Sequence, residues 1–302
     1  MSASFCGHAL SWSRVDDALE VELNRAPANE LGTTTVRELE QLVEYVGSGA
    51  GGARALIWHS TLDRGFSAGA DLRELHAGLV ERTERQTAAV DRWTDALPDR
   101  AARLVERGAK RVAAPLIRRR VGQFIDRIHA VFDALDQAPL TTIAAVHGVC
   151  LGGGLEWALT ADIIVADKSA RFGFPELRLG LIPGFGGIPR LERDVGAAVV
   201  RDLLFTGRTI RASRAFELGL VSQVVARGEA LHVARQVAKQ AARFDPAVVA
   251  QAKAFVKPLP ASRLQEEKAT FLRMVTDPTV FESLTRFVED QGPMPWLPGG
   301  ST

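Results

Sequence analysis

Two glutamates stand in segments whose composition suits acid–base chemistry. Glu156 directly follows the run Gly152-Gly153-Gly154, and Glu176 lies among apolar and glycine residues. Burial near an apolar pocket raises the pKa of a carboxyl group toward neutrality, so two such groups are typical of a general acid and a general base. The alternative for Glu156 is a carboxylate that only stabilises the positive end of a helix dipole.

Two loops of small residues have the composition of an oxyanion-binding site. Phe66–Asp71 and Leu151–Glu156 each follow a predicted strand and open a predicted helix, so their backbone N–H groups would lie at the positive end of a helix dipole. Glycine and alanine allow a ligand to approach the backbone closely. Two converging loops predict an oxyanion hole, in which one donor contributes about 2.7–4 kcal/mol of barrier lowering. Taken singly, each loop is more often a tight strand-to-helix turn than a catalytic device.

Strands and helices alternate along the first two thirds of the chain, and they must position these loops. Apolar runs predict strands at Ala18–Leu23, Ala53–His59, Thr141–Val149 and Asp162–Ala166, and helical spacing predicts a helix at Thr33–Val46. Such alternation favours an α/β fold with parallel crossovers. Further elements are predicted as a helix at Val121–Asp136, a strand at Leu220–Val225, and helices at Glu229–Phe244, Pro246–Val256, Arg263–Val275 and Thr279–Val288.

Bulk composition limits the function classes. The 302 residues are 46% hydrophobic and 24% charged with a formal net charge of +1, which is ordinary for a globular protein and argues against dedicated binding of nucleic acid or anionic membranes. Cys6 and Cys150 form neither a disulfide framework nor a metal-ligand cluster. No targeting segment or membrane-spanning apolar run is recognised, so we expect a cytoplasmic protein without membrane contacts.

Four motifs follow one another as in the crotonase, or enoyl-CoA hydratase/isomerase, superfamily, which this sequence resembles. They are Phe66–Leu72, Ala144–Glu156, Ala161–Asp162 and Pro175–Gly187. The resemblance implies a crotonase-like α/β fold, with a spiral core of ββα units over residues 1–200 and a mainly helical trimerisation lobe over residues 201–302. It also implies an acyl-CoA thioester substrate, a homotrimer or dimer of trimers, and no metal. Coenzyme A would be part of the substrate, and no separate cofactor is expected.

The resemblance also assigns roles to individual residues. The backbone N–H groups of Ala70 and Gly153 correspond to the family's oxyanion hole, Glu156 would deprotonate the water, and Glu176 would protonate the α-carbon. Retention of both glutamates favours an enoyl-CoA hydratase-like hydro-lyase. An isomerase or thioester hydrolase of the same superfamily remains an alternative, as does a non-catalytic or RNA-binding homologue. The further positions that match substrate-binding segments are Ala26, Ala28, Ala68, Asp71, Leu72, Arg73, Gly152, Pro175 and Gly184.

Two departures from the family pattern affect the expected substrate contacts. Phe287–Gln291 is acidic where similar proteins tend to be basic, which puts the family's cross-subunit phosphate contact in doubt. For Arg73, two interpretations have equal weight: a ligand of the substrate's phosphate, or a solvated surface side chain. An arginine-rich insertion covers about residues 74–120. It is predicted to form a lid, a wall of the acyl pocket or a dock for an acidic acyl-carrier protein, and the alternative is a solvated pair of helices.

Overall fold

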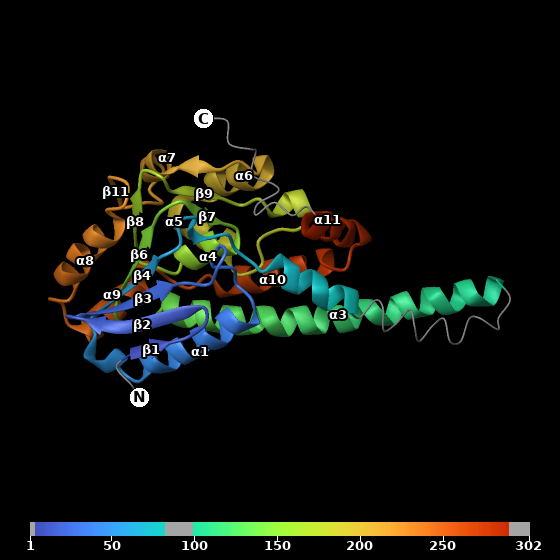
Figure 1. The fold of residues 1–302 in the computed structure, drawn as a ribbon, viewed down its shortest axis with the longest axis horizontal. Helices are drawn as coiled ribbons and strands as arrows, with labels where there is room; N and C mark the ends of the chain where they lie inside the picture. The colour runs from blue at the N-terminus through green and yellow to red at the C-terminus, as the bar shows by residue number, and fades with distance from the viewer. Residues whose placement is uncertain (1–3, 82–98, 290–302) are drawn as a thin grey trace.

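The larger of two sheets forms the base of the fold. In this computed structural model, residues 4–81 and 99–289 are described, with only the backbone described for residues 99–113 (Figure 1). The sheet has seven strands. β3, β4, β6, β8 and β11 run parallel to one another, while β1 pairs with β2, and β2 with β3, in antiparallel orientation. Their order is β1 (Ser4–Cys6), β2 (Leu10–Val15), β3 (Ala18–Leu23), β4 (Ala55–Ser60), β6 (Thr141–Val146), β8 (Ile163–Asp167) and β11 (Gln223–Val225).

A second, smaller sheet carries the segments of chemical interest. Its order is β10 (Ile210–Arg211), β9 (Arg171–Gly173), β7 (Val149–Leu151) and β5 (Gly65–Ser67), and β9, β7 and β5 are parallel. The successive strand pairs β4 and β5, β6 and β7, and β8 and β9 each place their first strand in the large sheet and their second in the small one. The carboxyl ends of β5, β7 and β9 therefore lie side by side.

The sequence predicts a near-continuous strand at Thr141–Val149 that Gly148 interrupts, but it does not predict that the chain leaves one sheet and enters the other there. β6 ends at Val146 and β7 begins at Val149. Gly148 between them has a φ of +54°, in the left-handed region that favours glycine. An apolar run of this kind has no periodicity that reveals a change of sheet, since both strands are largely buried.

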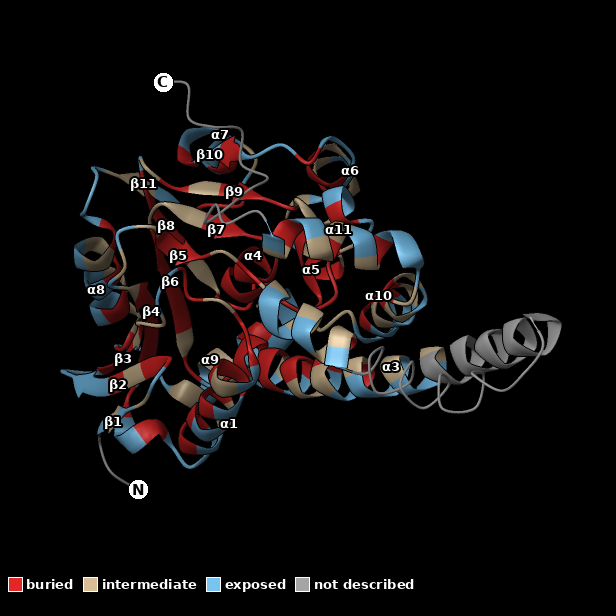
Figure 2. Cartoon of the chain, turned by 45° about the vertical axis from the view of Figure 1, so that its right-hand side comes forward, coloured by how far each residue is buried: buried red, intermediate tan, exposed pale blue. Residues whose placement is uncertain are grey.

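Helices cover both faces of the large sheet. On one face, α8 (Ala230–Ala241) packs Ala230, Ala234 and Ala238 against apolar residues of the strands. On the other lie α1 (Thr33–Gly47), α3 (Asp99–Asp136) and the buried α4 (Gly153–Ala158), with α1 packed on α3. Figure 2 shows the buried residues concentrated in these strands and in α4.

The predicted helix Val121–Asp136 is the second half of α3, whose first half belongs to the arginine-rich insertion. α3 has 38 residues, and its N-terminal part projects from the body of the molecule (Figure 1). Residues 72–81 are also helical and directly follow the first small-residue loop. The rest of the insertion, residues 82–98, lies outside the described residues.

The C-terminal helices pack onto the core near the small sheet. α10 contacts α3 and α5, and α11 contacts η2. Across residues 4–81 and 99–289, no helix is long and apolar enough to cross a membrane. The remaining elements are η1 (Ala50–Gly52), η2 (Glu176–Leu179), α5 (Gly187–Val195), α6 (Ala197–Thr206), α7 (Ala212–Glu217), α9 (Pro246–Val256), α10 (Ala261–Met274) and α11 (Pro278–Glu289).

Candidate active site

Three short segments meet at the carboxyl ends of the small sheet's parallel strands. Ala68–Ala70 follows β5, Gly152–Glu156 follows β7, and Pro175–Glu176 follows β9. Because β7 lies between β5 and β9, the glycine-rich segment lies between the other two. The carboxyl edge of parallel strands is where α/β proteins commonly bind their ligands.

A cavity of about 590 Å³ opens at this edge. It brings together most of the site residues predicted from the sequence, including both glutamates and both predicted oxyanion donors. Of the predicted residues, those among its described lining are Ala68, Ala70, Asp71, Leu72, Gly152, Gly153, Glu156, Pro175, Glu176 and Gly184.

Three predicted residues are not among the described residues that line the cavity. The carbonyl of Ala28 accepts the N–H of Ala68 at 2.9 Å, so Ala28 holds the first loop by a backbone hydrogen bond. Ala26 lies in the same segment as Ala28. The guanidinium of Arg73 lies 5.6 Å from the Phe287 ring and donates to the carbonyl of Val288. In this chain Arg73 thus contacts α11, and its predicted phosphate contact stays a prediction.

Backbone hydrogen bonds hold the residues next to the donor residue in each of the two predicted oxyanion loops. In the first, Leu31 donates to the Gly69 carbonyl at 2.8 Å and its own carbonyl accepts the N–H of Asp71 at 3.0 Å. In the second, Gly152 donates to Gly173 of β9 at 3.0 Å. The backbone around Ala70 and Gly153 is therefore held by its neighbours while both residues line the cavity.

Gly152 permits the close approach of the second glutamate. Its φ is +50°, and a Cβ there would lie 2.5 Å from Oε1 of Glu176. Any side chain at this position would be strained and would collide with the carboxyl group. The triple glycine is thus explained in part by the space that Glu176 occupies.

Glu156 is buried on α4 and accepts two backbone hydrogen bonds. Its Oε1 lies 2.8 Å from the nitrogens of both Phe185 and Gly187. Burial raises the pKa of Glu156 to about 7, against the effect of the N–H groups of Gly187 and Phe185, which favour the ionised form. Glu156 can therefore accept a proton near neutral pH.

Glu176 opens η2, and its environment differs from that of Glu156. Its Oε2 is buried without a hydrogen-bond partner among the described residues. Burial, followed by the charge of Glu156, raises the pKa of Glu176 well above its usual range. Because the pair titrates together, the first proton is lost mainly from Glu156 while Glu176 keeps its own. The arrangement supplies one base and one acid in a single cavity.

The wall of the cavity is largely apolar and includes part of the insertion. Residues 72–81 contribute Leu72, Leu75 and Leu79, and α3 contributes Ile117, Val121 and Phe124. The ring of Phe124 meets Phe185 edge to face, with centroids 6.3 Å apart. Within the described ranges, no group of three His, Cys, Asp or Glu side chains could hold a metal ion.

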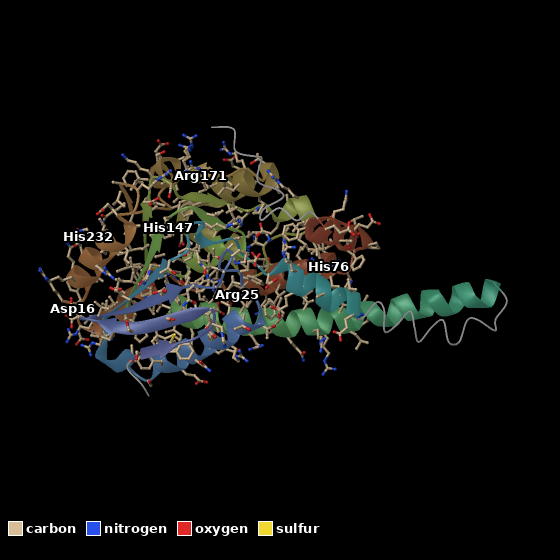
Figure 3. All side chains as sticks on the ribbon, viewed as in Figure 1. Asp16, Arg25, His76, His147, Arg171 and His232 are labelled. Carbon is tan, nitrogen blue, oxygen red and sulfur yellow. The ribbon has the colours of Figure 1, made fainter. Side chains whose placement is uncertain are left out.

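The helix at residues 72–81 is tied to both sides of the cavity mouth. Asp71 accepts the N–H of Glu74 and pairs with Arg25 at 2.5 Å, so its carboxylate is engaged within the protein. The His76 ring stacks on Phe281 of α11, with centroids 5.6 Å apart, and its Nε2 lies 3.0 Å from Oγ1 of Thr285. Figure 3 labels Arg25 near the centre of the molecule and His76 beside α11.

Sequence reasoning missed Glu267, a buried glutamate that α10 brings to residues 184–188. Its carboxylate accepts the N–H groups of Gly186 and Ile188. In the sequence, Glu267 follows another glutamate and precedes Lys268, which is typical of a solvated helix face. Its Leu264 and Phe271 neighbours at helical spacing are the available signal that this face is buried.

Comparisons with known proteins identify the family and the fold. A sequence model described as enoyl-CoA hydratase/isomerase matches residues 118–296. The fold and this match show that the chain belongs to the enoyl-CoA hydratase/isomerase family, which confirms the predicted family and the crotonase-like α/β fold. The first loop, with Ala70, precedes the matched range.

Individual relatives bear similar names. The chain is 35% identical over 178 residues to a probable mitochondrial enoyl-CoA hydratase 2 of Arabidopsis thaliana, covering 58% of this chain and 59% of the relative. It is 43% identical over 119 residues to a short-chain-enoyl-CoA hydratase of Clostridium acetobutylicum, covering 39% of this chain and 46% of the relative. The matches thus span about half the length of these curated relatives.

Solved structures show the same fold. A putative enoyl-CoA hydratase from Streptomyces avermitilis superposes with a TM-score of 0.74 at 21% identity, covering 100% of this chain and 95% of the other. At this identity the likeness concerns the fold alone. An enoyl-CoA hydratase from Bacillus anthracis superposes with a TM-score of 0.64 at 27% identity, covering 93% and 96%.

Proposed function

We propose that this protein is a hydro-lyase that adds water to the double bond of a 2-enoyl-CoA thioester. The observation that carries the proposal is the pair of buried carboxylates, Glu156 and Glu176, whose environments separate their affinities for protons in one cavity. The hydratase names of the relatives support the same reaction class.

The proposed reaction uses four residues. The thioester carbonyl oxygen accepts the N–H groups of Ala70 and Gly153, which makes the β-carbon electrophilic. Glu156 removes a proton from water as the water oxygen bonds to that carbon, and the electrons of the double bond pass to the carbonyl oxygen. Glu176 then delivers its proton to the α-carbon, the carbonyl re-forms, and a 3-hydroxyacyl thioester results.

The proposed acyl group is an apolar chain. Leu75 and Leu79 face the cavity from one helix, and Val121 and Phe124 face it from α3. Such walls favour methylene groups over charged or hydroxylated substituents, because a polar group there would lose its hydration without a partner.

A hydration assay tests the proposal. Incubation of the protein with 2-enoyl-CoA thioesters of several chain lengths should remove the absorbance of the conjugated thioester and yield 3-hydroxyacyl-CoA. Glu156→Gln and Glu176→Gln should each lower turnover by about 10²–10⁴-fold, since general acid or base catalysis is worth that much, while sparing the affinity for a saturated acyl-CoA.

The products separate the alternatives. Free coenzyme A would identify a thioester hydrolase, and a 3-enoyl product would identify an isomerase. Absence of any reaction with every chain length, or full turnover in both glutamine variants, would contradict the hydratase assignment.

A further inference from the structure

One turn of the chain, residues 184–188, presents its backbone N–H groups in alternation to two different carboxylates. The N–H groups of Phe185 and Gly187 both donate to Oε1 of Glu156 at 2.8 Å. These two bonds make the largest contributions to stabilising the ionised form of Glu156 against the cost of its burial, followed by the charge of Arg190 and the N–H of Gly184.

The N–H groups of the residues on either side of Gly187 donate to the second carboxylate, that of Glu267. Gly186 donates to Oε1 of Glu267 at 2.6 Å, and Ile188 donates to Oε2 at 2.9 Å. Glu267 lies on α10, far from Glu156 in the sequence, and it is only 5% exposed. The two glutamates therefore accept alternate N–H groups of the same turn.

Glu267 does not reach the substrate cavity directly. Gly184, Phe185 and Glu156 are among the described residues that line it, and Glu267 is not. An effect of Glu267 on chemistry in the cavity therefore passes through Glu156, either by way of the turn or by the charge interaction between the two carboxylates.

Other charged and titratable groups complete the surroundings of the turn. Arg190 of α5 donates to the carbonyls of Phe185 and Gly186 at 3.2 and 3.3 Å and is itself paired with Asp133 and Asp136. His129 of α3 lies 3.0 Å from the Gly184 carbonyl, and its burial lowers its pKa to about 4, so it stays neutral. Burial and the charge of Glu156 raise the pKa of Glu267, as they do for Glu176.

We propose that Glu267 is a positioning residue: by holding the N–H groups of Gly186 and Ile188, it keeps those of Phe185 and Gly187 on Glu156. Without it the turn loses two of the hydrogen bonds that hold it beside Glu156, and the donation of Phe185 and Gly187 to Glu156 weakens. That this serves a catalytic base rests on the proposed function, whereas the effect on Glu156 itself does not.

Direct titration of Glu156 tests the proposal without any substrate. In protein labelled with ¹³C at glutamate carboxyl carbons, the resonance missing from Glu156→Gln identifies Glu156. Its midpoint, near pH 7 in the wild type, should rise by about one pH unit in Glu267→Ala, because weaker N–H donation disfavours the ionised form. Glu267→Gln keeps one acceptor and should produce a smaller rise.

The matched control is Glu266→Gln, which alters the adjacent residue of the same helix. Glu266 is exposed and pairs with Arg263 at 2.7 Å, so its loss should leave the Glu156 midpoint unchanged. An unchanged midpoint in folded Glu267→Ala and Glu267→Gln, or an equal rise in the control, overturns the proposal.

Wild-type protein provides a readout that needs no variant to fold. The amide protons of Phe185 and Gly187 should shift with the Glu156 midpoint, and those of Gly186 and Ile188 should shift further at a higher pH, as Glu267 titrates. If the amide protons of Gly186 and Ile188 show no such second shift, the proposed positioning role of Glu267 is overturned.

Kinetic measurements separate the positioning role of Glu267 from the proposed hydration reaction. In the Glu267 variants, the acidic limb of kcat/KM should move to higher pH together with the Glu156 midpoint, while KM changes little. If the wild type hydrates no enoyl thioester, the proposed function fails, and the titration of Glu156 still decides whether Glu267 positions it.

Discussion

At the scale of single residues, the two glutamates of the cavity differ in their partners rather than in their type. Glu156 has two N–H donors on one oxygen, whereas Oε2 of Glu176 has no partner among the described residues and lies near the charge of Glu156. Burial raises the pKa of both, and these partners decide which carboxyl group ionises first.

The pH dependence of kcat/KM should follow from this difference. Activity should rise as pH increases through the pKa of Glu156, near 7, because the base must be ionised. It should fall at higher pH, as Glu176 loses the proton that it must deliver. Steady-state kinetics should give a bell-shaped profile whose two apparent values belong to the coupled pair.

The variant Glu176→Gln distinguishes the two limbs. Glutamine does not titrate, so the residual activity should lose its alkaline limb. The acidic limb should stay near pH 7, because Glu176 is still protonated and uncharged when Glu156 ionises. A profile that still falls at high pH with the wild-type midpoint would contradict the role of Glu176 as the acid.

At the scale of elements, the site depends on three very short strands and one very long helix. β5, β7 and β9 have three residues each and bring the three site segments to one edge. Within the insertion, Ile117 of α3 lines the cavity together with Leu75 and Leu79 of the helix at residues 72–81. The described part of the insertion thus supports a role as an acyl-pocket wall.

The substitution Ile117→Trp tests that role. A larger side chain at this wall should shorten the cavity, lowering kcat/KM for long acyl chains relative to short ones by about 10–100-fold, since each methylene of fit carries a factor of this order. Comparison of 2-enoyl-CoA substrates of increasing length measures the ratio.

Ala130→Trp is the matched control, because Ala130 lies on the exposed side of the same helix. It should leave the chain-length ratio unchanged. If both variants behave alike, α3 does not bound the acyl group.

At the scale of the whole molecule, a buried ionic cluster joins α3, α5 and the end of α9. Asp136 is fully buried and lies 3.0 Å from Arg190, 2.9 Å from Arg193 and 2.7 Å from Lys257. Burial disfavours its ionised form, yet these three cations hold the pKa of Asp136 below its usual range. The carboxylate therefore stays ionised in the folded protein.

Asp136→Asn should lower the free energy of unfolding by about 3–5 kcal/mol at neutral pH, because it leaves buried cations without their counter-charge. The stabilisation from Asp136 is present above the pKa of the unfolded carboxyl and is lost as pH falls through the lower folded value. Urea denaturation across pH measures both effects.

Glu217→Gln provides a comparison at the surface. The Arg214–Glu217 pair is exposed, so its loss should cost at most about 1 kcal/mol. Equal destabilisation by the two substitutions would contradict the importance of the buried cluster.

We also propose self-association through α9, in line with the trimer that the resemblance implies. Val248 and Phe255 are 63% and 87% exposed and lie two helical turns apart on one face, and Val256 is 74% exposed. Light scattering should give a mass several times that of the 32.6 kDa chain, and Phe255→Ser should reduce it. A wild-type mass of 32.6 kDa would contradict the proposal.

The sequence by itself determined the family, the α/β class and ten of the residues that line the cavity, because motifs such as Gly152–Glu156 carry their requirements in local composition. Strands of three residues have no readable periodicity, so the small sheet and the passage of the chain from one sheet to the other at Gly148 appear only in the tertiary structure. Glu267 is the clearest case, since its contact with residues 184–188 depends on how α10 packs, and local patterns do not encode contacts between distant segments.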